Sequence, residues 1–228
     1  MLKYIFNISL FFCLLTQAFG QEGKFLPTSL RAGVEVANFG YSLFKDNFDF
    51  WEVEGDIDFH RYLLVVDYGY TKFSQLYEPV INQQYGYFTY QSNGNYFRAG
   101  ADVNFIKNET HHNVLALGLR YGWTTFKESS DYSTYNVIEH YSVWPEDTLH
   151  YSENNAKGRW LEMCASLKAQ IFKQLYFGFT VRYKILPGVR KDGTFKTYYL
   201  PGFGKTINNN NWGLNYYISY RIPFRKQK

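Results

Sequence analysis

Between about residues 29 and 224, eight segments of the chain alternate apolar and polar positions with a period of two. A clear case is the run in which Glu52 and Glu54 alternate with Trp51 and Val53. Because successive side chains of a β-strand point to opposite faces, each segment forms a strand with one apolar and one polar face. Few soluble β-proteins line every strand with so many charges, whereas a sheet closed in lipid keeps charge in its lumen. The pattern therefore predicts an all-β fold, an eight-stranded antiparallel transmembrane β-barrel.

The predicted strands lie at residues 30–36, 51–59, 64–71, 97–105, 115–124, 161–168, 175–185 and 212–222. None of the residues on their apolar faces is charged, and a charge there would cost roughly 2–4 kcal/mol at the bilayer midplane. The links alternate in length: long links fall at residues 37–50, 72–95, 125–158 and 187–211, and short ones at 60–63, 106–113 and 172–174. This alternation predicts four long external loops and three short periplasmic turns, with both termini in the periplasm. The loops are rich in Tyr, Asn, Ser and Gly, and we expect them to be exposed and partly mobile.

The polar faces carry eight acids and seven bases, so the predicted lumen is nearly neutral. These residues form the predicted ionic network: Arg31, Glu35, Glu52, Glu54, Asp56, Asp58, Asp67, Arg98, Asp102, Arg120, Glu162, Lys168, Arg182, Lys184 and Arg221. Eight strands enclose an interior just wide enough for side chains to fill, and buried acids need bases within reach. We therefore expect a closed lumen in which the second strand's four acids meet bases of the strands near the closure. The expected acids are Glu52, Glu54, Asp56 and Asp58, and their expected partners are Arg182, Lys184, Arg221 and Arg31.

The first twenty residues have the pattern of an export signal. Lys3 precedes an apolar run at residues 5–15, and Ala18 and Gly20 provide small residues for cleavage. We expect residues 1–20 to be a signal peptide and residues 21–228 to form one outer-membrane barrel domain. Cleavage would leave Cys164 as the one cysteine, which excludes an internal disulfide and a zinc site built from cysteines. Cleavage would also remove Lys3 and change the formal net charge from +4 to about +3, which is too balanced for a nucleic-acid-binding protein.

Motifs for catalysis or cofactor binding are weak. His60 follows the acids of the second predicted strand. Together with a nearby serine it would suggest a hydrolase, but the sequence contains no Gly-x-Ser-x-Gly motif. His111 and His112 are adjacent, so their side chains diverge and chelation is poor. Residues 201–205 lack the spacing of a phosphate-binding loop and predict a glycine-bent loop. The sequence therefore predicts no catalytic residue, no cofactor and no metal site.

Several segments resemble an uncharacterised family of Bacteroidota outer-membrane β-barrels, catalogued as a domain of unknown function. They lie at residues 56–62, 96–105, 117–122, 160–162, 199–205 and 211–224. The resemblance implies an outer-membrane location and a barrel fold, and it transfers no active site. Many such barrels end on an aromatic residue that the insertion machinery reads, and here Phe224 precedes a four-residue basic tail. The implied partners are outer-membrane lipid and, during biogenesis, the barrel-insertion machinery.

For function, the sequence favours a non-enzymatic surface or envelope protein whose long loops contact a protein or glycan that the sequence does not identify. One alternative is a lipid-modifying outer-membrane enzyme, for which His140, Ser142 and Asp147 are the loose candidates. A second alternative is a secreted or periplasmic carrier of a small ligand, similar to a lipocalin. Such a carrier would need an apolar lumen, and the predicted inward charges argue against it.

Overall fold

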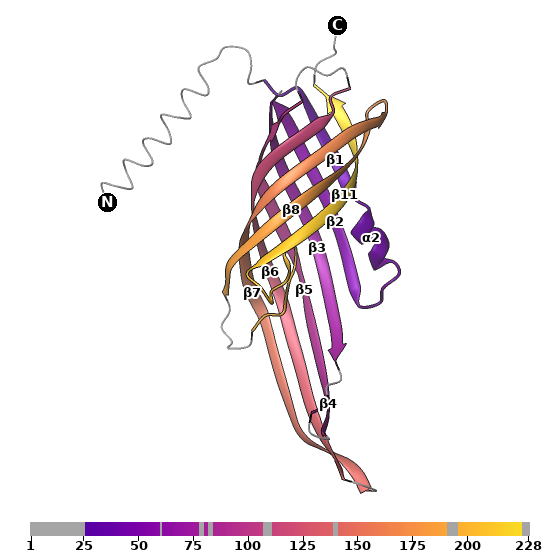
Figure 1. Ribbon diagram of the computed structural model, residues 1–228, viewed down its shortest axis with the longest axis vertical. Helices are drawn as coiled ribbons and strands as arrows, with labels where there is room; N and C mark the ends of the chain where they lie inside the picture. Colours follow the sequence, from indigo (N-terminus) through magenta and orange to yellow (C-terminus); the bar gives the residue numbers. More distant parts are fainter. Residues whose placement is uncertain are drawn as a thin grey trace, which may run out of the picture.

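The computed structural model describes residues 26–59, 61–77, 80–81, 84–106, 111–138, 141–190 and 196–224 (Figure 1). The first strands are β1 (Ser29–Glu35), β2 (Phe48–Phe59), β3 (Tyr62–Tyr77), β4 (Val80–Ile81) and β5 (Gln84–Asn104). They are followed by β6 (Val114–Ile138), β7 (Tyr141–Phe172), β8 (Leu175–Arg190), β9 (Tyr199–Leu200), β10 (Gly204–Lys205) and β11 (Asn210–Pro223). One short helix, α2 (Ala37–Ser42), lies between β1 and β2.

Eight of these strands form an antiparallel sheet that closes into a ring. Its order is β1, β2, β3, β5, β6, β7, β8 and β11, because β3 pairs with β5 and β11 returns to β1. At the closure Leu30 lies opposite Ile222 and Val34 opposite Ile218. The predicted all-β fold with eight antiparallel strands is confirmed. No helix among the described residues is long and apolar enough to cross a membrane.

Connections of different length lie at opposite ends of the ring. The start of β1 and the end of β11 are paired, and they share one end with the short connections after β2, β5 and β7 (Figure 1). Lys173, in the tight turn between β7 and β8, has a left-handed φ of 45°. We call this the turn end, and we call the opposite end, which carries the longer connections, the loop end.

The long connections differ from the predicted exposed loops. Most of the links at 72–95 and 125–158 are strand, because β3, β5, β6 and β7 continue far past the ring, and β6 and β7 pair as far as Ile138 and Tyr141. The result is a sheet that projects from the loop end (Figure 1), here called the projecting sheet. The strand pattern fades there because neither face needs to be uniformly apolar. Backbone pairing and the β-favouring Tyr and Thr residues maintain the strands instead.

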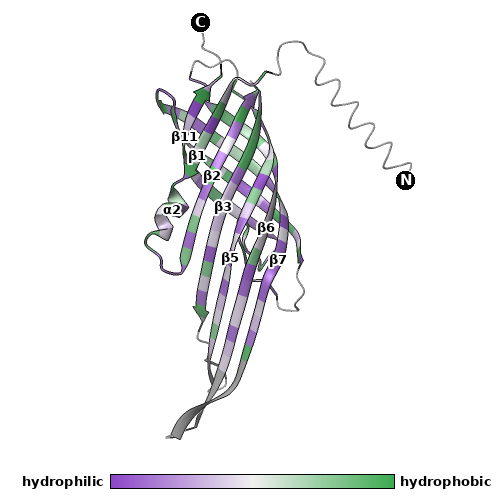
Figure 2. Cartoon of the chain, turned by 180° about the vertical axis from the view of Figure 1, so that it is seen from behind, coloured by the Kyte–Doolittle hydropathy of each residue, from purple (hydrophilic) through white to green (hydrophobic). Residues whose placement is uncertain are grey.

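The two faces of the ring have opposite character. Inward side chains such as Arg98 and Arg120 are each 1% exposed, whereas outward Leu119 and Met163 are 67% and 55% exposed. Hydrophilic and hydrophobic positions alternate along the strands (Figure 2). The buried residues also include two apolar clusters. One contains Leu63, Val65, Val114 and Ala116. The other, here called the apolar layer, contains Tyr96, Phe126, Ala156, Trp160, Leu186, Leu200 and Phe203.

Candidate functional site

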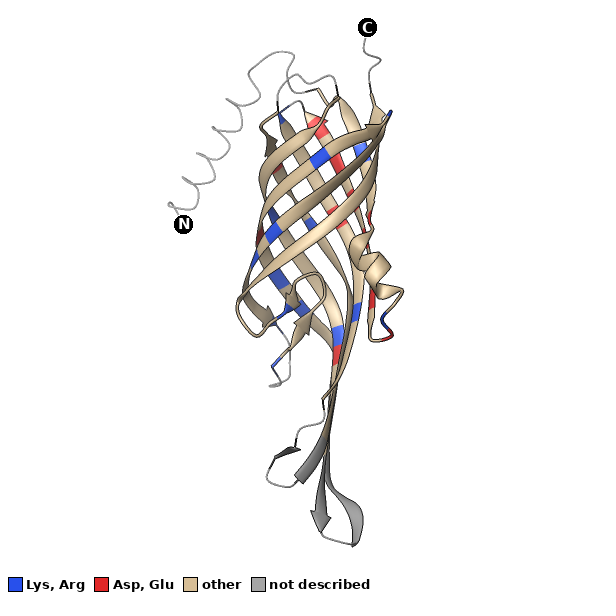
Figure 3. Ribbon diagram, turned by 45° about the vertical axis from the view of Figure 1, so that its right-hand side comes forward, with Lys and Arg blue, Asp and Glu red and all other residues tan. Residues whose placement is uncertain are grey.

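The lumen holds an ionic layer, in which acids and bases from many strands meet. Figure 3 shows acidic and basic positions interspersed along the ring. At its centre the Asp67 carboxylate of β3 lies 3.0 Å from Arg98 Nε, 2.8 Å from Arg120 Nη1 and 3.3 Å from Arg182 Nη1. All four side chains are at most 1% exposed. A single carboxylate therefore ties together arginines from β5, β6 and β8.

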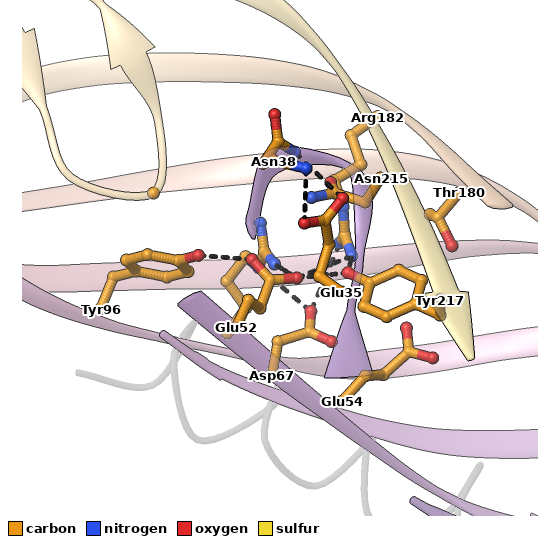
Figure 4. Close-up of polar contacts among 12 residues, drawn as sticks. Glu35, Asn38, Glu52, Glu54, Asp67, Tyr96, Thr180, Arg182, Asn215 and Tyr217 are labelled. Carbon is orange, nitrogen blue, oxygen red and sulfur yellow. Dashed lines mark hydrogen bonds and ion pairs between the residues drawn. The ribbon is translucent and has the colours of Figure 1, made fainter. Parts of the chain in front are cut away.

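Glu52 of β2 forms a second centre close to Asp67 (Figure 4). Its carboxylate lies 2.5 Å from Arg98 Nη2 and 3.8 Å from Arg182 Nη2. It also accepts hydrogen bonds from the hydroxyl groups of Tyr96 and Tyr217. Charge-assisted hydrogen bonds of this kind are roughly twice as strong as neutral ones, so Glu52 is held from several strands at once.

Glu162 of β7 completes this part of the layer. It lies 3.0 Å from Arg182 Nη1 and 3.6 Å from Arg98 Nη1. The indole Nε1 of Trp160 donates to it at 2.6 Å. Asp102 of β5 accepts from Arg120 Nη2 at 3.1 Å. Each of these arginines thus contacts more than one acid, which offsets the cost of burying its charge.

Towards the turn end, Lys168 of β7 bridges two acids of β2. Its Nζ lies 2.5 Å from Glu54 and 2.6 Å from Asp56. Arg31 of β1 contacts Asp56 at 2.8 Å and Asp58 at 3.6 Å. Lys168 reaches across the lumen from the opposite side of the ring, whereas Arg31 lies on the neighbouring strand.

Three members of the predicted ionic network make no direct ion pair among the described residues. Glu35 accepts from the backbone N–H groups of Asn38 at 2.9 Å and Tyr216 at 3.2 Å, so it stabilises the start of α2. Lys184 Nζ donates to the carbonyl of Gly202 at 2.7 Å. Arg221 Nε donates to the Ser29 hydroxyl at 3.0 Å. The predicted pairing of the β2 acids with Lys184 and Arg221 is therefore wrong.

The partners that replace them lie on other strands. Arg98, Arg120 and Lys168 bind the β2 acids, and of the four predicted bases only Arg31 and Arg182 do so in the described part of the chain. Strand order alone suggested bases close to the closure. A long side chain can reach a partner across a narrow lumen as easily as one on a neighbouring strand. Strand tilt also determines which residues of different strands lie at the same height in the lumen.

Several polar residues of the layer were not predicted from sequence. Tyr96, Tyr217, Trp160 and Asn215 all hydrogen-bond charged groups, and Asn215 accepts from Arg182 Nε at 3.0 Å. Each occupies the same alternate position as the charged residues of its strand. That position was the signal that could have identified them.

The last long connection folds back over the loop end of the lumen. Residues 196–206, which contain the β9–β10 hairpin and are here called the lid, place Leu200 and Phe203 in the apolar layer. The predicted glycine-bent loop at 201–205 is confirmed, because Gly202 and Gly204 have φ values of 79° and 106°. The expectation that this link is exposed is wrong at Leu200 and Phe203, which are 0% and 1% exposed. Lys184 binds the lid carbonyls, so the lid is joined directly to the ring.

The projecting sheet holds the other side of the lid. Ser92 Oγ donates to the Tyr199 carbonyl at 2.9 Å, and the Tyr90 hydroxyl donates to Glu128 at 2.9 Å. Glu128 also accepts from Thr197 Oγ1 at 3.0 Å. Burial and the neighbouring Glu128 carboxylate raise the pKa of Tyr90 well above its usual value, so its hydroxyl keeps its proton, and can donate to Glu128, even at alkaline pH. These contacts fix the lid over the lumen.

Most of the residues considered for catalysis lie where the structure does not describe their side chains. His60, His140 and the predicted signal peptide lie outside the described residues, as does the tail after Phe224. Ser142 and Asp147 lie in β7, where only their backbone is described. His111 is exposed, and its Nδ1 lies 2.8 Å from Gln170. Across the described residues, no three His, Cys, Asp or Glu side chains are grouped to hold a metal ion.

Comparison with known proteins adds a family but no activity. No curated protein matches the sequence. A family model described as a domain of unknown function, DUF6048, matches residues 1–227, which is almost the whole chain. The chain, with its closed eight-stranded sheet and its ionic lumen, therefore belongs to the DUF6048 family.

Proposed function

We propose that this protein is an outer-membrane β-barrel that is closed to ions and presents its projecting sheet at the cell surface, without catalytic activity. The observation that carries this proposal is the inverted distribution of side chains in the ring. Charged residues are buried inside, and large apolar residues are exposed outside. In water that arrangement would be unfavourable, but in lipid it places each face in its preferred surroundings.

The size of the apolar outer surface supports this placement. Along β11 the outward apolar positions run from Trp212 to Ile222. About ten residue steps of about 3.4 Å, tilted by about 40°, span about 26 Å. The apolar band of outer-membrane barrels is about 25 Å tall. A lipid-facing zone of the required height is therefore available.

Aromatic residues gather at the loop-end border of this zone. Phe97 and Trp123 lie with ring centroids 4.5 Å apart, and Tyr183 and Trp212 lie 4.9 Å apart. Aromatic rings with polar atoms prefer the membrane–water interface. Exposed aromatic residues also occur at the turn end, among them Tyr62, Phe105, Phe172 and Tyr220. The two groups resemble the paired girdles of membrane barrels.

The filled lumen supports an anchoring role rather than transport. Ion pairs cross it at several heights, and the apolar layer and lid cover the loop end. The charged interior also argues against a carrier of apolar ligands, because such a carrier would need an apolar lumen. A hollow of about 510 Å³ is lined by Val34, Val53 and Ile218 and lies over Ala32 and Gly55, on the outward face. In this proposal, that hollow faces acyl chains rather than a transported ligand.

Two measurements on the expressed protein test the proposal. Cell fractionation should recover the protein with the outer membrane and release it only with detergent, because its outer face needs a lipid-like environment. The purified protein in planar bilayers should give no steady conductance. Recovery in the soluble fraction without detergent would refute the membrane placement. Stable open-channel currents would refute the closed lumen and leave the placement standing.

A further inference from the structure

Four basic residues lie next to one another on the outer surface, where the projecting sheet leaves the ring. Lys127 is on β6, Lys157 and Arg159 are on β7, and Arg190 is on β8, and all four are exposed. Lys157 lies directly opposite Arg190, and Arg159 lies opposite Gly188 on the same strand pair. On the other side, Lys157 lies opposite Thr125, two residues from Lys127. We call these four residues the basic patch.

Nothing in the described part of the chain neutralises the basic patch with an ion pair. Two acids near the basic patch on β6 and β7, among the described residues, are engaged elsewhere: Asp131 contacts His150, and Glu153 accepts from the backbone N–H of Asn155 at 3.0 Å. Glu128 is 2% exposed and binds Tyr90 and Thr197 on the inward side. Like charges on directly opposed strand positions destabilise a sheet, so an anion bound here would relieve repulsion.

The location of the basic patch indicates which anion it meets. Arg159 lies opposite Trp123, a member of the aromatic border, and two residues from the exposed apolar Leu161. Two strand residues span about 7 Å, so the distance from the apolar zone to the start of the basic patch is about the height of one lipid headgroup. In the proposed membrane placement, on which this inference rests, that height is the layer of lipid headgroups.

We propose that the basic patch binds the phosphate groups of outer-leaflet lipid headgroups. Arginine binds phosphate with two parallel hydrogen bonds, and lysine adds point charge. A Lys or Arg near an anionic lipid surface contributes about a fivefold gain in affinity. Acyl chains against the exposed apolar residues below would hold the same lipid at its other end. The patch thus recognises a phosphate carried by a lipid.

A basic residue at a similar height, two strands away from Lys127 on the same sheet, provides an internal control. Lys72 of β3 shares a row with Lys127, because both lie opposite Asn93 of β5. Unlike the basic patch, Lys72 has an acidic partner, with its Nζ 3.5 Å from Asp49. That pair is already neutral, so Lys72 should add little to phosphate binding.

The test compares lipid binding with and without phosphate. Full-length purified protein in nonionic detergent is incubated with bisphosphorylated lipid A or with the same lipid stripped of phosphate, and bound lipid is counted by native mass spectrometry. Wild type should retain the phosphorylated lipid at least tenfold better. The combined variant Lys127→Gln, Lys157→Gln, Arg159→Gln and Arg190→Gln should lose this preference, and Lys72→Gln should keep it. Altered migration in unboiled gels verifies that each variant is folded.

Each other outcome overturns the inference. Equal retention of the two lipids, or an unchanged preference in the combined variant, shows that the basic patch does not read phosphate. Full displacement of the lipid by millimolar inorganic phosphate assigns the patch to free phosphate. Stronger binding of polygalacturonate, which carries carboxylates and no acyl chain, assigns it to acidic glycans. A folded, detergent-extracted protein that fails these tests still supports the membrane placement, whereas a protein soluble without detergent refutes both proposals.

Discussion

The ionic layer and the apolar layer lie on the same inward face of the same strands, but they are held together in different ways. On β7 the inward positions change from Lys168 and Glu162 to Trp160 and Ala156 within a few residues. In the ionic layer most of the charges are paired with opposite charges on other strands of the ring. In the apolar layer part of the filling comes from the lid, which is a connection rather than a ring strand.

The difference shows what each layer requires of the sequence. A buried charge requires all its partners, because removing one leaves another charge uncompensated. A buried apolar side chain requires only volume, and the cost of removing it depends on how well its neighbours relax. Substitutions in the ionic layer should therefore cost the most stability, and substitutions in the lid should cost less and depend more on shape.

The largest expected effect is that of Asp67→Asn. This change keeps the size of the side chain but removes the one charge that Arg98, Arg120 and Arg182 share. The remaining acids then compensate the three buried arginines only in part, which should lower the free energy of unfolding by about 3–5 kcal/mol. Urea unfolding of the protein in detergent micelles, followed by tryptophan fluorescence, measures the loss.

Asp49→Asn is the matched control for that substitution. Asp49 pairs with Lys72 at 3.5 Å, but its side chain is 55% exposed. Water already solvates this pair, so the loss should stay below about 1 kcal/mol. Comparable losses for the two variants would mean that burial of the ionic layer does not govern its contribution.

The next effect in size is that of Phe203→Ala in the lid. The ring of Phe203 is 1% exposed and lies 6.3 Å from that of Trp160, centroid to centroid. Deleting it should reduce the free energy of unfolding by about 3 kcal/mol in the same urea experiment. The variant should remain non-conducting in planar bilayers, because the ionic layer below is intact. A steady conductance would show that the lid, and not the ionic layer, closes the lumen.

Phe44→Ala serves as the control for the loss of an aromatic ring. Phe44 is 86% exposed in the connection after α2, so little apolar surface returns to solvent when it is removed. Its unfolding midpoint should be close to that of wild type. A large shift would reveal a contact of this connection that burial does not indicate.

Apart from the control variants, the smallest expected effect is that of Gly202→Ala at the bend of the lid. Gly202 has a φ of 79°, and a Cβ atom there would lie 2.5 Å from Cγ of Tyr96. The strain and the displaced ring should cost about 1–3 kcal/mol of unfolding free energy. Gly40→Ala in α2, where a Cβ meets nothing within 4 Å, should be neutral or stabilise by up to about 1 kcal/mol. Equal effects at both glycines would argue against a tight lid.

Much of the ring could be read from the sequence because its signal is local. Alternation places Glu52, Glu54 and Asp56 on one face of β2 whatever the rest of the chain does. The same rule separates inward Arg182 from outward Val181 on β8. The projecting sheet was harder to read because both of its faces tolerate polar residues. Its strands therefore lack the regular alternation that marked the ring.

The sequence by itself determined which residues point inward, how many strands close the ring and at which end the short turns lie. The tertiary structure alone decided that Asp67 gathers three arginines, that Lys168 reaches Glu54 and Asp56, and that Lys184 binds the lid. The physical reason is that the first set of properties depends on local sequence and the second on contacts between distant strands. The face of a side chain is set by its own strand, whereas its partner across the lumen depends on strand tilt and stagger, which only the closed ring fixes.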